Sequence, residues 1–380
     1  MAPMSQLFCQ HQIGAFFKQW DESIPLDLAL SHFFRAHKNL GSHDRRYIGD
    51  SIYQLVRWRS LFECLDPDGS IAKKLYLLEK KTIEEWVCEP RLPLWAQKGT
   101  SPFLLEQFTA AYGREKGLAL LDVCNGAAPI AIRANIGKIS RDELFSRFSL
   151  QFNVWKGSIA DTAIIFAKRE PLFALPEFKE GLFEMQDEGS QLVASLVEAK
   201  PGDRVLDYCS GSGGKSLAIA PKMQKKGELY LHDIRESALD QARKRLRRAG
   251  VQNSQVLQPG HPTLPKLYGK MDWVVVDVPC SGTGTLRRNP EMKWKIDAAL
   301  VDRLIQEQQE IAMEAIRYLK PTGRLVYATC SILPQENEEQ VDFLIRRAGL
   351  ELDKEPLKLL PQEGSCDGFF AAVFRKSKMR

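Results

Sequence analysis

Two cysteines follow apolar segments that have the composition of buried strands. Cys280 comes directly after "WVVVDVP", and Cys330 comes directly after "GRLVYAT". A single cysteine at such a place is usually a small buried hydrophobic residue. Two thiols at the carboxyl ends of strands in one sheet could instead meet in one cleft. Because a thiolate is a strong nucleophile, the pair predicts covalent catalysis by cysteine.

Methylation of carbon 5 of a pyrimidine is a reaction that needs such a thiol. That carbon is a poor nucleophile until a thiolate adds to carbon 6, and an acid near N3 of the ring supports the addition. The adduct then attacks a methyl donor, and loss of the carbon-5 proton lets the thiol leave. Asp277 lies in the same loop as Cys280 and is a candidate for this acid. A target base inside a stem would also have to leave its stack.

A glycine-rich stretch, "LDYCSGSGGKS" (206–216), follows another apolar segment. A phosphate-binding P-loop ending at Lys215 would need glycine at position 209, which is cysteine. A dinucleotide loop starting at Gly211 would need glycine at position 216, which is serine. The third candidate ligand is S-adenosylmethionine, whose amino-acid moiety requires close approach of the loop backbone and therefore favours glycine. The loop residues expected to contact it are Cys209, Ser210, Gly211, Ser212, Gly213, Gly214 and Lys215.

An acid at the end of the next strand would accept hydrogen bonds from the ribose of the ligand. Asp233, at the end of "LYLHDI", fits this role. Dinucleotide sites use an acid in the same way, so Asp233 does not separate the two ligands.

From about residue 185 to the end, predicted strands alternate with predicted helices. The helices are "SQLVASLVEA", 236–249, 300–319 and 335–348, and the strands are "RVLDYC", "ELYLHDI", "WVVVDVP", "GRLVYATCS" and "FFAAVFRK". This alternation predicts a doubly wound, mostly parallel sheet that binds ligands at the carboxyl ends of its strands. The glycine loop and both cysteines would then lie along one edge.

The preceding part of the chain has a different pattern. Residues 1–90 have apolar residues at helical spacing, and "EPRLPLWAQKGTSPF" (89–103) has the composition of a linker. In the segment that follows, "AIRAN" and "TAIIFAK" are predicted strands and "RDELFSRF" is a predicted helix. We therefore expect three domains: an all-α domain at 1–90, a small α+β domain at 91–182, and the α/β domain at 183–380.

The chain has 380 residues and a net charge of +5, which is compatible with nucleic acid but weak support for it. Basic residues concentrate at 243–248 and 286–295, which we expect to form an RNA surface together with the N-terminal domain; a solvated helix face is the alternative for 243–248. There is no membrane-length apolar run and no signal peptide, so we expect a cytoplasmic protein with reduced thiols. The cysteine spacing predicts no metal site.

With these residues in view, the chain resembles the Sun/Fmu (RsmB-like) family of RNA cytosine-5 methyltransferases over nearly its whole length. The motifs that carry the resemblance are "LFEMQDEGSQLVASLVEAKPGDRVLDYCSGSGGKS", "DVPCSGTGTLRRNPEMKW", "ATCSILPQENEEQV" and "DGFFAAVFRK". "DRRYIGDSIYQLVRWR" is similar to the helical, antitermination-factor-like domain of bacterial ribosomal-RNA members. The resemblance implies a Rossmann-like domain that uses S-adenosylmethionine.

The resemblance also assigns roles that the chemistry leaves open. It implies that Cys330 is the nucleophile and that Cys280 assists release of the product, although DNA cytosine methyltransferases use the Pro-Cys position as nucleophile. It places Lys215 near the active centre and Asp277 against the target base and the cofactor. The expected partner is RNA, ribosomal by resemblance, with transfer RNA as an alternative, and the protein is expected to be a monomer. A protein that binds RNA or assists ribosome assembly without turnover is the other reading.

Two positions depart from the family pattern. The family's loop usually reads Cys-Ala-Ala-Pro-Gly-Gly-Lys, whereas this chain has Ser210, Gly211 and Ser212 before the two glycines. Loss of the proline predicts a looser loop. Gln258 stands where a further cofactor-contacting Asp is usual, and the resemblance makes it a candidate contact to the adenine.

Overall fold

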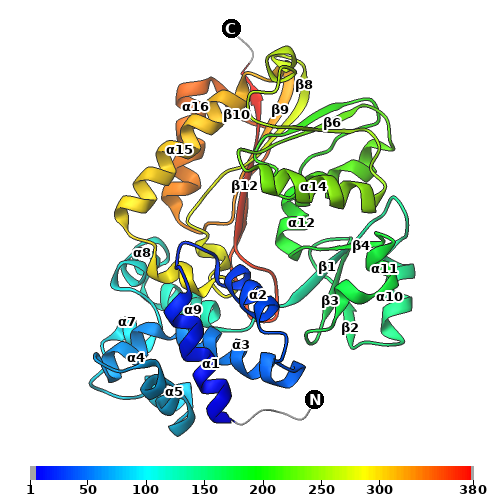
Figure 1. Cartoon of the computed structure of the whole chain (residues 1–380). Coiled ribbons are helices and arrows are strands. Elements are labelled where there is room, and N and C mark those ends of the chain that lie inside the picture. Colours follow the sequence, from blue (N-terminus) through cyan, green and yellow to red (C-terminus); the bar gives the residue numbers. More distant parts are fainter. Residues whose placement is uncertain (1–5, 378–380) are drawn as a thin grey trace. The chain divides into compact units, whose positions relative to one another are not determined.

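The structure, a computed structural model that describes residues 6–377, separates into two compact units (Figure 1). The first comprises the chain up to Ala127 together with Thr285–Leu300, and the second comprises Ala128–Gly284 and the chain from Val301 onward. The expected boundary near residue 90 does not coincide with this division. Helix α7 (Leu94–Gln97) belongs to the first unit because it packs against α4 (Arg59–Leu65) and α6 (Ile83–Val87).

The first unit is helical, as the apolar spacing predicts. Its remaining helices are α1 (Gln6–Gln19), α2 (Leu26–Ala36), α3 (Ser42–Arg57), α5 (Ile71–Lys80), α8 (Pro102–Tyr112) and α9 (Arg114–Asn125). Ile13, Phe16 and Phe33 share one core with Ile48 and Phe62. The Asp44 carboxylate accepts the backbone N–H of Gly41 and so caps the start of α3.

Much of the segment Thr285–Leu300 packs into the helical unit, and two of its cations are buried there. Lys293 is 1% exposed, and its ammonium donates to the Gly99 carbonyl (3.0 Å) and to the Asn125 side chain. Burial lowers the pKa of Lys293 to about 7. Arg287 is 3% exposed, and the indole of Trp294 donates to a carbonyl of α3 (2.7 Å). The prediction that 286–295 forms an RNA surface is therefore wrong for its buried cations.

The second unit contains a small antiparallel sheet with strand order β2-β3-β1-β4. Its strands are β1 (Ile130–Ala134), β2 (Val154–Lys156), β3 (Ala163–Phe166) and β4 (Phe183–Met185). Helices α10 (Arg141–Ser149) and α11 (Pro176–Lys179) accompany it, and Phe148 of α10 packs against Phe166 and Phe183 of the sheet. The two predicted strands and the predicted helix of this segment are confirmed.

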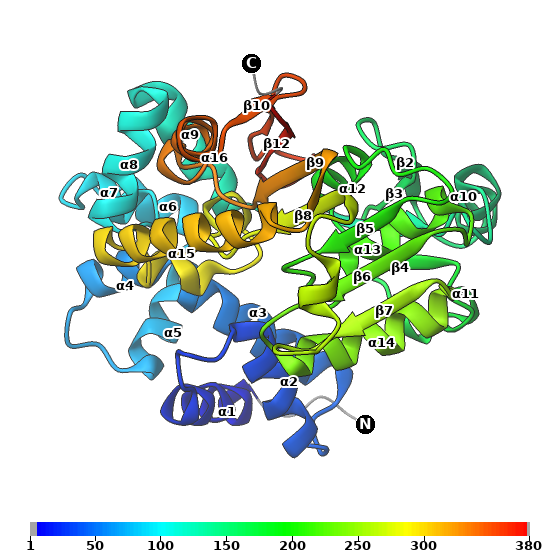
Figure 2. The ribbon, with the colours of Figure 1, turned by 90° about the horizontal axis from the view of Figure 1, so that it is seen from above.

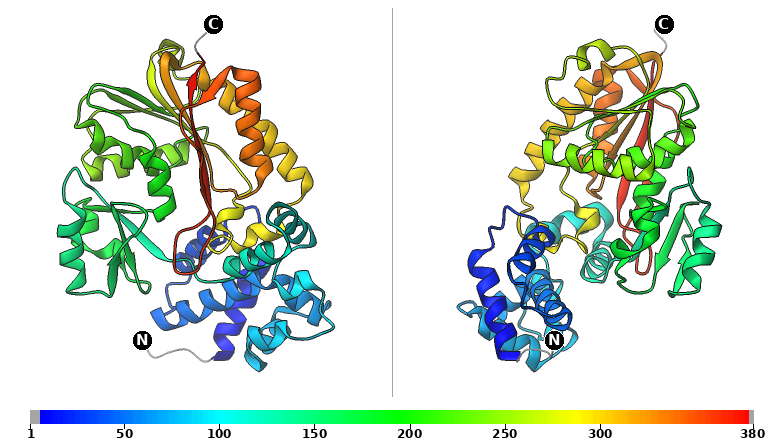
Figure 3. Two further views of the ribbon diagram at one scale, coloured as in Figure 1. Left: turned by 180° about the vertical axis from the view of Figure 1, so that it is seen from behind. Right: turned by 45° about the vertical axis from the view of Figure 1, so that its right-hand side comes forward.

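A larger sheet of eight strands forms the rest of the second unit, and its strand order is β10-β12-β9-β8-β5-β6-β7, with β11 paired to β12. Five strands run parallel: β5 (Arg204–Asp207), β6 (Glu228–His232), β7 (Ser254–Leu257), β8 (Met271–Asp277) and β9 (Leu319–Thr329). Strand β12 (Phe369–Lys376, red) runs antiparallel beside β9 (Figure 3), and β10 (Leu350–Leu352) and β11 (Leu357–Leu359) are antiparallel to β12.

Helices cover both faces of the larger sheet (Figure 2). Helices α13 (Gly214–Ile219) and α14 (Glu236–Ala249) pack on the face that carries Val205 and Leu231. Helices α15 (Ala298–Ile316) and α16 (Glu338–Ala348) pack on the face that carries Val274 and Tyr327. The helix α12 (Glu188–Ser195) precedes β5 and also contacts β1 of the small sheet. The predicted doubly wound, mostly parallel sheet is confirmed.

Within residues 6–377, no helix combines the length and the apolar character needed to span a membrane.

Candidate active site

A cavity of about 620 Å³ lies in the second unit at the carboxyl ends of β5, β6, β8 and β9. Ten of the residues singled out in the sequence line it: Cys209, Ser210, Gly211, Ser212, Gly214, Lys215, Asp233, Asp277, Cys280 and Cys330. The edge of the sheet therefore brings the glycine loop, the acids and both thiols to one place, as the strand pattern predicts.

The glycine loop depends on two residues with left-handed backbone. Gly211 has φ +53° and Gly213 has φ +80°, values that side-chain-bearing residues rarely adopt. A Cβ atom on Gly213 would lie 3.2 Å from Leu231 and 3.4 Å from Ala242, so this glycine packs behind the loop and does not line the cavity. The backbone N–H of Ser210 donates to the His232 carbonyl (2.9 Å) and ties the loop to the end of β6.

Asp233 is a buried carboxylate beside the glycine loop, with 4% of its surface exposed. It accepts the backbone N–H of Gly211 (2.8 Å) and the Nε of Arg235 (3.0 Å). Burial alone would raise the pKa of Asp233, but the hydrogen bonds from Arg235 and Gly211 lower it. Asp233 is therefore an ionised acceptor. The next side chain, Ile234, lines the same cavity and is 73% exposed.

Lys215 and Asp277 form an ion pair in the wall of the cavity. Lys215 is only 8% exposed. Burial opposes its charge, but the charge and hydrogen bond of Asp277, together with the charge of Asp207, raise the pKa of Lys215. The Lys215 ammonium also interacts electrostatically with Cys330. A fixed positive charge therefore stands beside one of the two thiols.

The two predicted thiols meet: the Sγ atoms of Cys280 and Cys330 are 3.3 Å apart. The hydrogen bond to Cys330 and burial raise the pKa of Cys280 well above its usual range, and the negative charge of Glu336 adds to this shift. Cys280 is therefore held as a thiol, whereas Cys330 has a cation close by.

A buried polar network fixes the loop that carries Cys280. The Glu336 carboxylate is fully buried and accepts the backbone N–H (2.8 Å) and the hydroxyl of Ser281. It also accepts the Gln308 amide (2.9 Å), which in turn donates to the Pro279 carbonyl (3.0 Å). The loop is thus held on both sides of Cys280.

The loops of the two thiols are also tied to each other directly. The Thr283 and Ser331 hydroxyls are 3.0 Å apart, and the backbone N–H of Gly284 donates to the Cys330 carbonyl (2.9 Å). A Cβ atom on Gly284 would lie 2.3 Å from the Gly368 carbonyl oxygen, so only glycine fits there. The distance between the thiols is therefore set by a rigid pair of loops.

Asp207 is a cavity residue that the sequence reasoning missed. It is 1% exposed, accepts the Ser216 hydroxyl (2.7 Å) with one oxygen, and has no partner among the described residues for the other. Burial raises the pKa of Asp207 to about 6. The Ser210 hydroxyl is likewise buried without a partner in the described part of the chain. Both residues line the cavity, so the site offers unmatched polar atoms to a ligand.

The other lining residues that sequence reasoning missed are Met185, Gln186, Ser190, Tyr208, His232, Ile234, Arg235, Arg245, Val278, Pro279, Glu307 and Ile311. Tyr208 directly follows β5, and Ile234 and Arg235 come within three residues of the end of β6, so these positions could have been found from the strand pattern. Gln258 is different: it is exposed beyond the end of β7 and is not part of the cavity wall. As a cofactor contact it has no support from the geometry.

The basic run 243–248 is only partly a solvent-exposed face. Arg245 and Arg248 are half-buried and pair with Glu184 of β4, whereas Lys244 and Arg247 are exposed. Arg245 and Arg248 therefore do not fit the expectation that 243–248 forms part of an RNA surface, because their guanidinium groups pair with Glu184 inside the unit.

Comparison with known proteins places this site in a family. Residues 194–375 match the model of the family described as 16S rRNA methyltransferase RsmB/F. The ribosomal RNA small subunit methyltransferase B of Enterobacter sp. (strain 638) is 34% identical over 287 residues, which are 72% of this chain and 66% of that protein. The 26S rRNA (cytosine-C(5))-methyltransferase nsun-1 of Caenorhabditis elegans is 31% identical over 288 residues, or 72% of this chain and 42% of that protein. The match thus spans slightly less than two thirds of the bacterial relative.

Solved structures show the same fold. The crystal structure of PH0851 has a TM-score of 0.83 and 21% identity, covering 98% of this chain and 99% of that one. The structure of NSun6 from Pyrococcus horikoshii with SFG has a TM-score of 0.67 and 21% identity, covering 73% of this chain and 99% of that one. The family model and the sequence matches agree, and the chain belongs to the RsmB/F family of methyltransferases.

Proposed function

We propose that this protein transfers the methyl group of S-adenosylmethionine to carbon 5 of a cytosine in RNA, through a covalent adduct between Cys330 and carbon 6 of the base. The observation that carries the proposal is the pair of thiols 3.3 Å apart in the wall of the glycine-loop cavity. A dinucleotide-dependent oxidoreductase would have no use for this pair. Carbon-5 methylation needs one thiol to attack and benefits from a second group beside it.

The cavity fits S-adenosylmethionine, which supplies an electrophilic methyl group when bound. Its volume of about 620 Å³ is in the range of small-molecule sites. Asp233 is ionised and can accept the ribose hydroxyls, and the exposed side chain of Ile234 offers an apolar surface for the adenine. The unpartnered Asp207 oxygen and Ser210 hydroxyl can bond polar groups of the ligand. Gln258 has no part in this assignment.

The surroundings of the thiols favour Cys330 as the nucleophile. A nearby cation stabilises a thiolate, and the Lys215 ammonium interacts with Cys330. Cys280 instead faces the negative charge of Glu336, and its raised pKa keeps it protonated. Cys280 can therefore donate a hydrogen bond to the Cys330 thiolate before the reaction. This asymmetry supports the roles implied by the family resemblance.

The reaction then follows from the positions of these groups. The Cys330 sulfur adds to carbon 6 of the cytosine, while the Lys215–Asp277 ion pair stabilises the charge that develops at N3. Carbon 5 becomes nucleophilic and attacks the methyl carbon that S-adenosylmethionine would supply, whose bond to the sulfonium sulfur breaks as the new bond forms. A base then takes the carbon-5 proton, and the electron pair of that C–H bond re-forms the double bond between carbons 5 and 6 and expels the Cys330 thiolate. Cys280, next to that sulfur, assists this elimination and release of the RNA.

Ribosomal RNA is the substrate that we propose. The bacterial relative is named for the small-subunit ribosomal RNA, and the helical unit would bind RNA in addition to the catalytic cavity. The chain acts as a monomer in this proposal. Transfer RNA is the alternative substrate, and comparison of methylation of the two RNAs by the purified protein decides between them.

Cysteine variants test the proposal with labelled S-adenosylmethionine and RNA. We expect Cys330→Ala to abolish methyl transfer, and Cys280→Ala to accumulate a covalent protein–RNA adduct on a denaturing gel. Cys88→Ala is the matched control, since Cys88 is an exposed cysteine of the helical unit. An active Cys330→Ala protein together with an inactive, adduct-free Cys280→Ala protein would reverse the assignment. RNA binding by the wild-type protein without methyl transfer would favour the non-catalytic alternative.

A further inference from the structure

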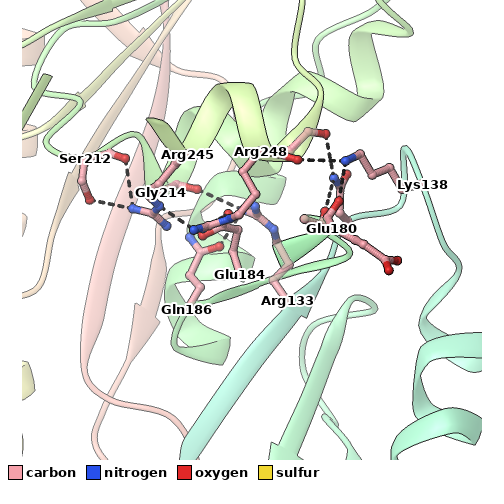
Figure 4. Close-up of polar contacts among 12 residues, drawn as sticks. Arg133, Lys138, Glu180, Glu184, Gln186, Ser212, Gly214, Arg245 and Arg248 are labelled. Carbon is pink, nitrogen blue, oxygen red and sulfur yellow. Dashed lines mark hydrogen bonds and ion pairs between the residues drawn. The ribbon is translucent and has the colours of Figure 1, made fainter. Parts of the chain in front are cut away.

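A cluster of charged side chains lies behind the glycine loop, where the small sheet meets α14 (Figure 4). Arg133 of β1 is 4% exposed and Glu184 of β4 is 3% exposed. Arg245 and Arg248, both on α14, complete the cluster with Glu184. One carboxylate therefore stands among three guanidinium groups, an arrangement that burial alone would oppose.

Arg245 bridges the small sheet and the glycine loop. Its Nη1 donates both to the Ser212 carbonyl (3.0 Å) and to the Ser212 hydroxyl (2.6 Å). Its Nε donates to Glu184 (3.1 Å), which orients the planar guanidinium. In Figure 4, Arg245 reaches from α14 toward Ser212 on one side, with Glu184 below it. Arg245 also lines the cavity.

Arg133 makes a second contact to the same loop. Its Nη1 donates to the Gly214 carbonyl (2.9 Å) and to the Gln186 side chain (2.7 Å), and Gln186 lines the cavity. The loop is therefore held from outside at the residues on both sides of Gly213, the glycine with φ +80°.

Arg248 pairs with the same carboxylate, Glu184, but its contacts lead away from the glycine loop. It donates to the other oxygen of Glu184 and lies 3.8 Å above the Phe178 ring. The Lys138 ammonium joins the Glu180 carbonyl (2.6 Å) to the Arg248 carbonyl (2.8 Å) at the end of α14. These contacts attach α14 to the small sheet, and within residues 6–377 none of them reaches the glycine loop. Arg248 is therefore a natural control for Arg245.

The hydrogen bonds of Arg245 restrain the glycine loop, which the loss of the proline was expected to loosen. Ser212 stands where the resemblance places a proline, and a proline would have limited the backbone at that position. Here a charge-assisted pair of hydrogen bonds limits the same residue instead. A buried ion pair is weak support for stability, but it can fix the geometry of a site. A loop that is already ordered in the free protein loses little conformational entropy when a ligand binds.

We propose that Arg245 is a positioning residue for the cofactor: oriented by Glu184, it holds Ser212 and keeps the glycine loop in the form that receives S-adenosylmethionine. The small antiparallel sheet thereby contributes to cofactor binding, because it supplies Glu184. This proposal rests on the assignment of the cavity to S-adenosylmethionine under the proposed function.

Titration calorimetry with S-adenosylmethionine separates positioning from simple stabilisation. Arg245→Met and Arg248→Met each remove one guanidinium from Glu184, and both lower the melting temperature of the free protein. Only Arg245→Met frees the loop, so we expect its Kd to rise about tenfold or more while that of Arg248→Met stays within about twofold of wild type. Equal Kd values for the two variants would overturn the proposal.

Ser212→Ala provides a milder second variant that removes only the hydroxyl contact. We expect it to raise Kd by itself and to add less than a factor of two when Arg245→Met is already present, because the two groups act as one unit. Independent, multiplying effects would contradict the pairing. A wild-type protein that fails to bind S-adenosylmethionine would contradict the proposed function itself, which distinguishes that failure from failure of the Arg245 proposal.

Discussion

Replacement of Glu336 by alanine is the perturbation that most sharply tests how the Cys280 loop is held. The carboxylate is fully buried and accepts the backbone N–H of Ser281 at 2.8 Å and the Gln308 amide at 2.9 Å. In Glu336→Ala, the Ser281 hydroxyl can turn to Thr283 or Ser331, each 3.2 Å away. The Ser281 N–H and one N–H of Gln308 have no such alternative.

The expected magnitude follows from these two donors. A buried donor left without a partner costs about 1–3 kcal/mol, so the two together lower the free energy of unfolding by about 2–6 kcal/mol. Glu336→Gln keeps one oxygen that can accept both N–H groups. Its amide NH2 replaces the second oxygen and can donate to the Ser281 hydroxyl oxygen. We expect that variant to lose less than about 1.5 kcal/mol.

Urea unfolding of the three proteins, with Glu310→Ala as control, measures these differences. Glu310 is exposed on α15, two residues beyond Gln308, so its variant should lie within about 0.5 kcal/mol of wild type. Methyl transfer should fall in Glu336→Ala, because the anchor of the Cys280 loop is gone. A Glu336→Ala protein that is as stable and as active as Glu310→Ala would refute the role of the network.

Three further predictions concern the cavity and the loops that carry the thiols. Burial raises the pKa of Asp207 to about 6, above an unfolded value of about 3.9, so the free energy of unfolding of the wild-type protein falls as pH rises through this window. In urea unfolding, Asp207→Asn should therefore gain up to about 3 kcal/mol relative to wild type between pH 3.5 and pH 8. A stability difference between the two proteins that does not change with pH would contradict this prediction. Gly284→Ala should lower the melting temperature by several degrees, because its Cβ would lie 2.3 Å from the Gly368 oxygen. An unchanged melting temperature would show that the two loops can move apart and are not rigid. Asp233→Ala should raise the Kd for S-adenosylmethionine at least tenfold in calorimetry, and an unchanged Kd would remove Asp233 from the site.

The sequence predicts which residues lie at the cavity edge of the sheet, because residues that follow parallel strands come together at the carboxyl ends of those strands. Cys280 and Cys330 follow β8 and β9, which are neighbours in the sheet, so the predicted meeting of the thiols is confirmed. Asp233 directly follows β6, which lies beside β5, and this brings it to the glycine loop in the same way. Alternation of strands and helices predicts that these residues lie along one edge of the sheet, whereas the order of the strands comes from the structure.

Contacts that depend on packing between distant segments were beyond such patterns. Arg245 occurs in a basic run typical of a solvated helix face, and its partner Glu184 is 61 residues away on another sheet. Lys293 occurs in a segment with the composition of an RNA-binding surface, yet it is buried among carbonyl and amide oxygens of the helical unit. Gln258 was predicted from resemblance alone; it is exposed and is not among the residues that line the cavity, so its contact with the cofactor stays a prediction.

The position of the methyl group on the product tests the central claim most directly. Purified protein, S-adenosylmethionine and ribosomal RNA are incubated together, and the RNA is digested to nucleosides and analysed by mass spectrometry against standards. The proposed mechanism predicts 5-methylcytidine with the wild-type protein and none with Cys330→Ala. A methyl group on a cytosine nitrogen or on the ribose, or 5-methylcytidine formed by Cys330→Ala, would contradict it.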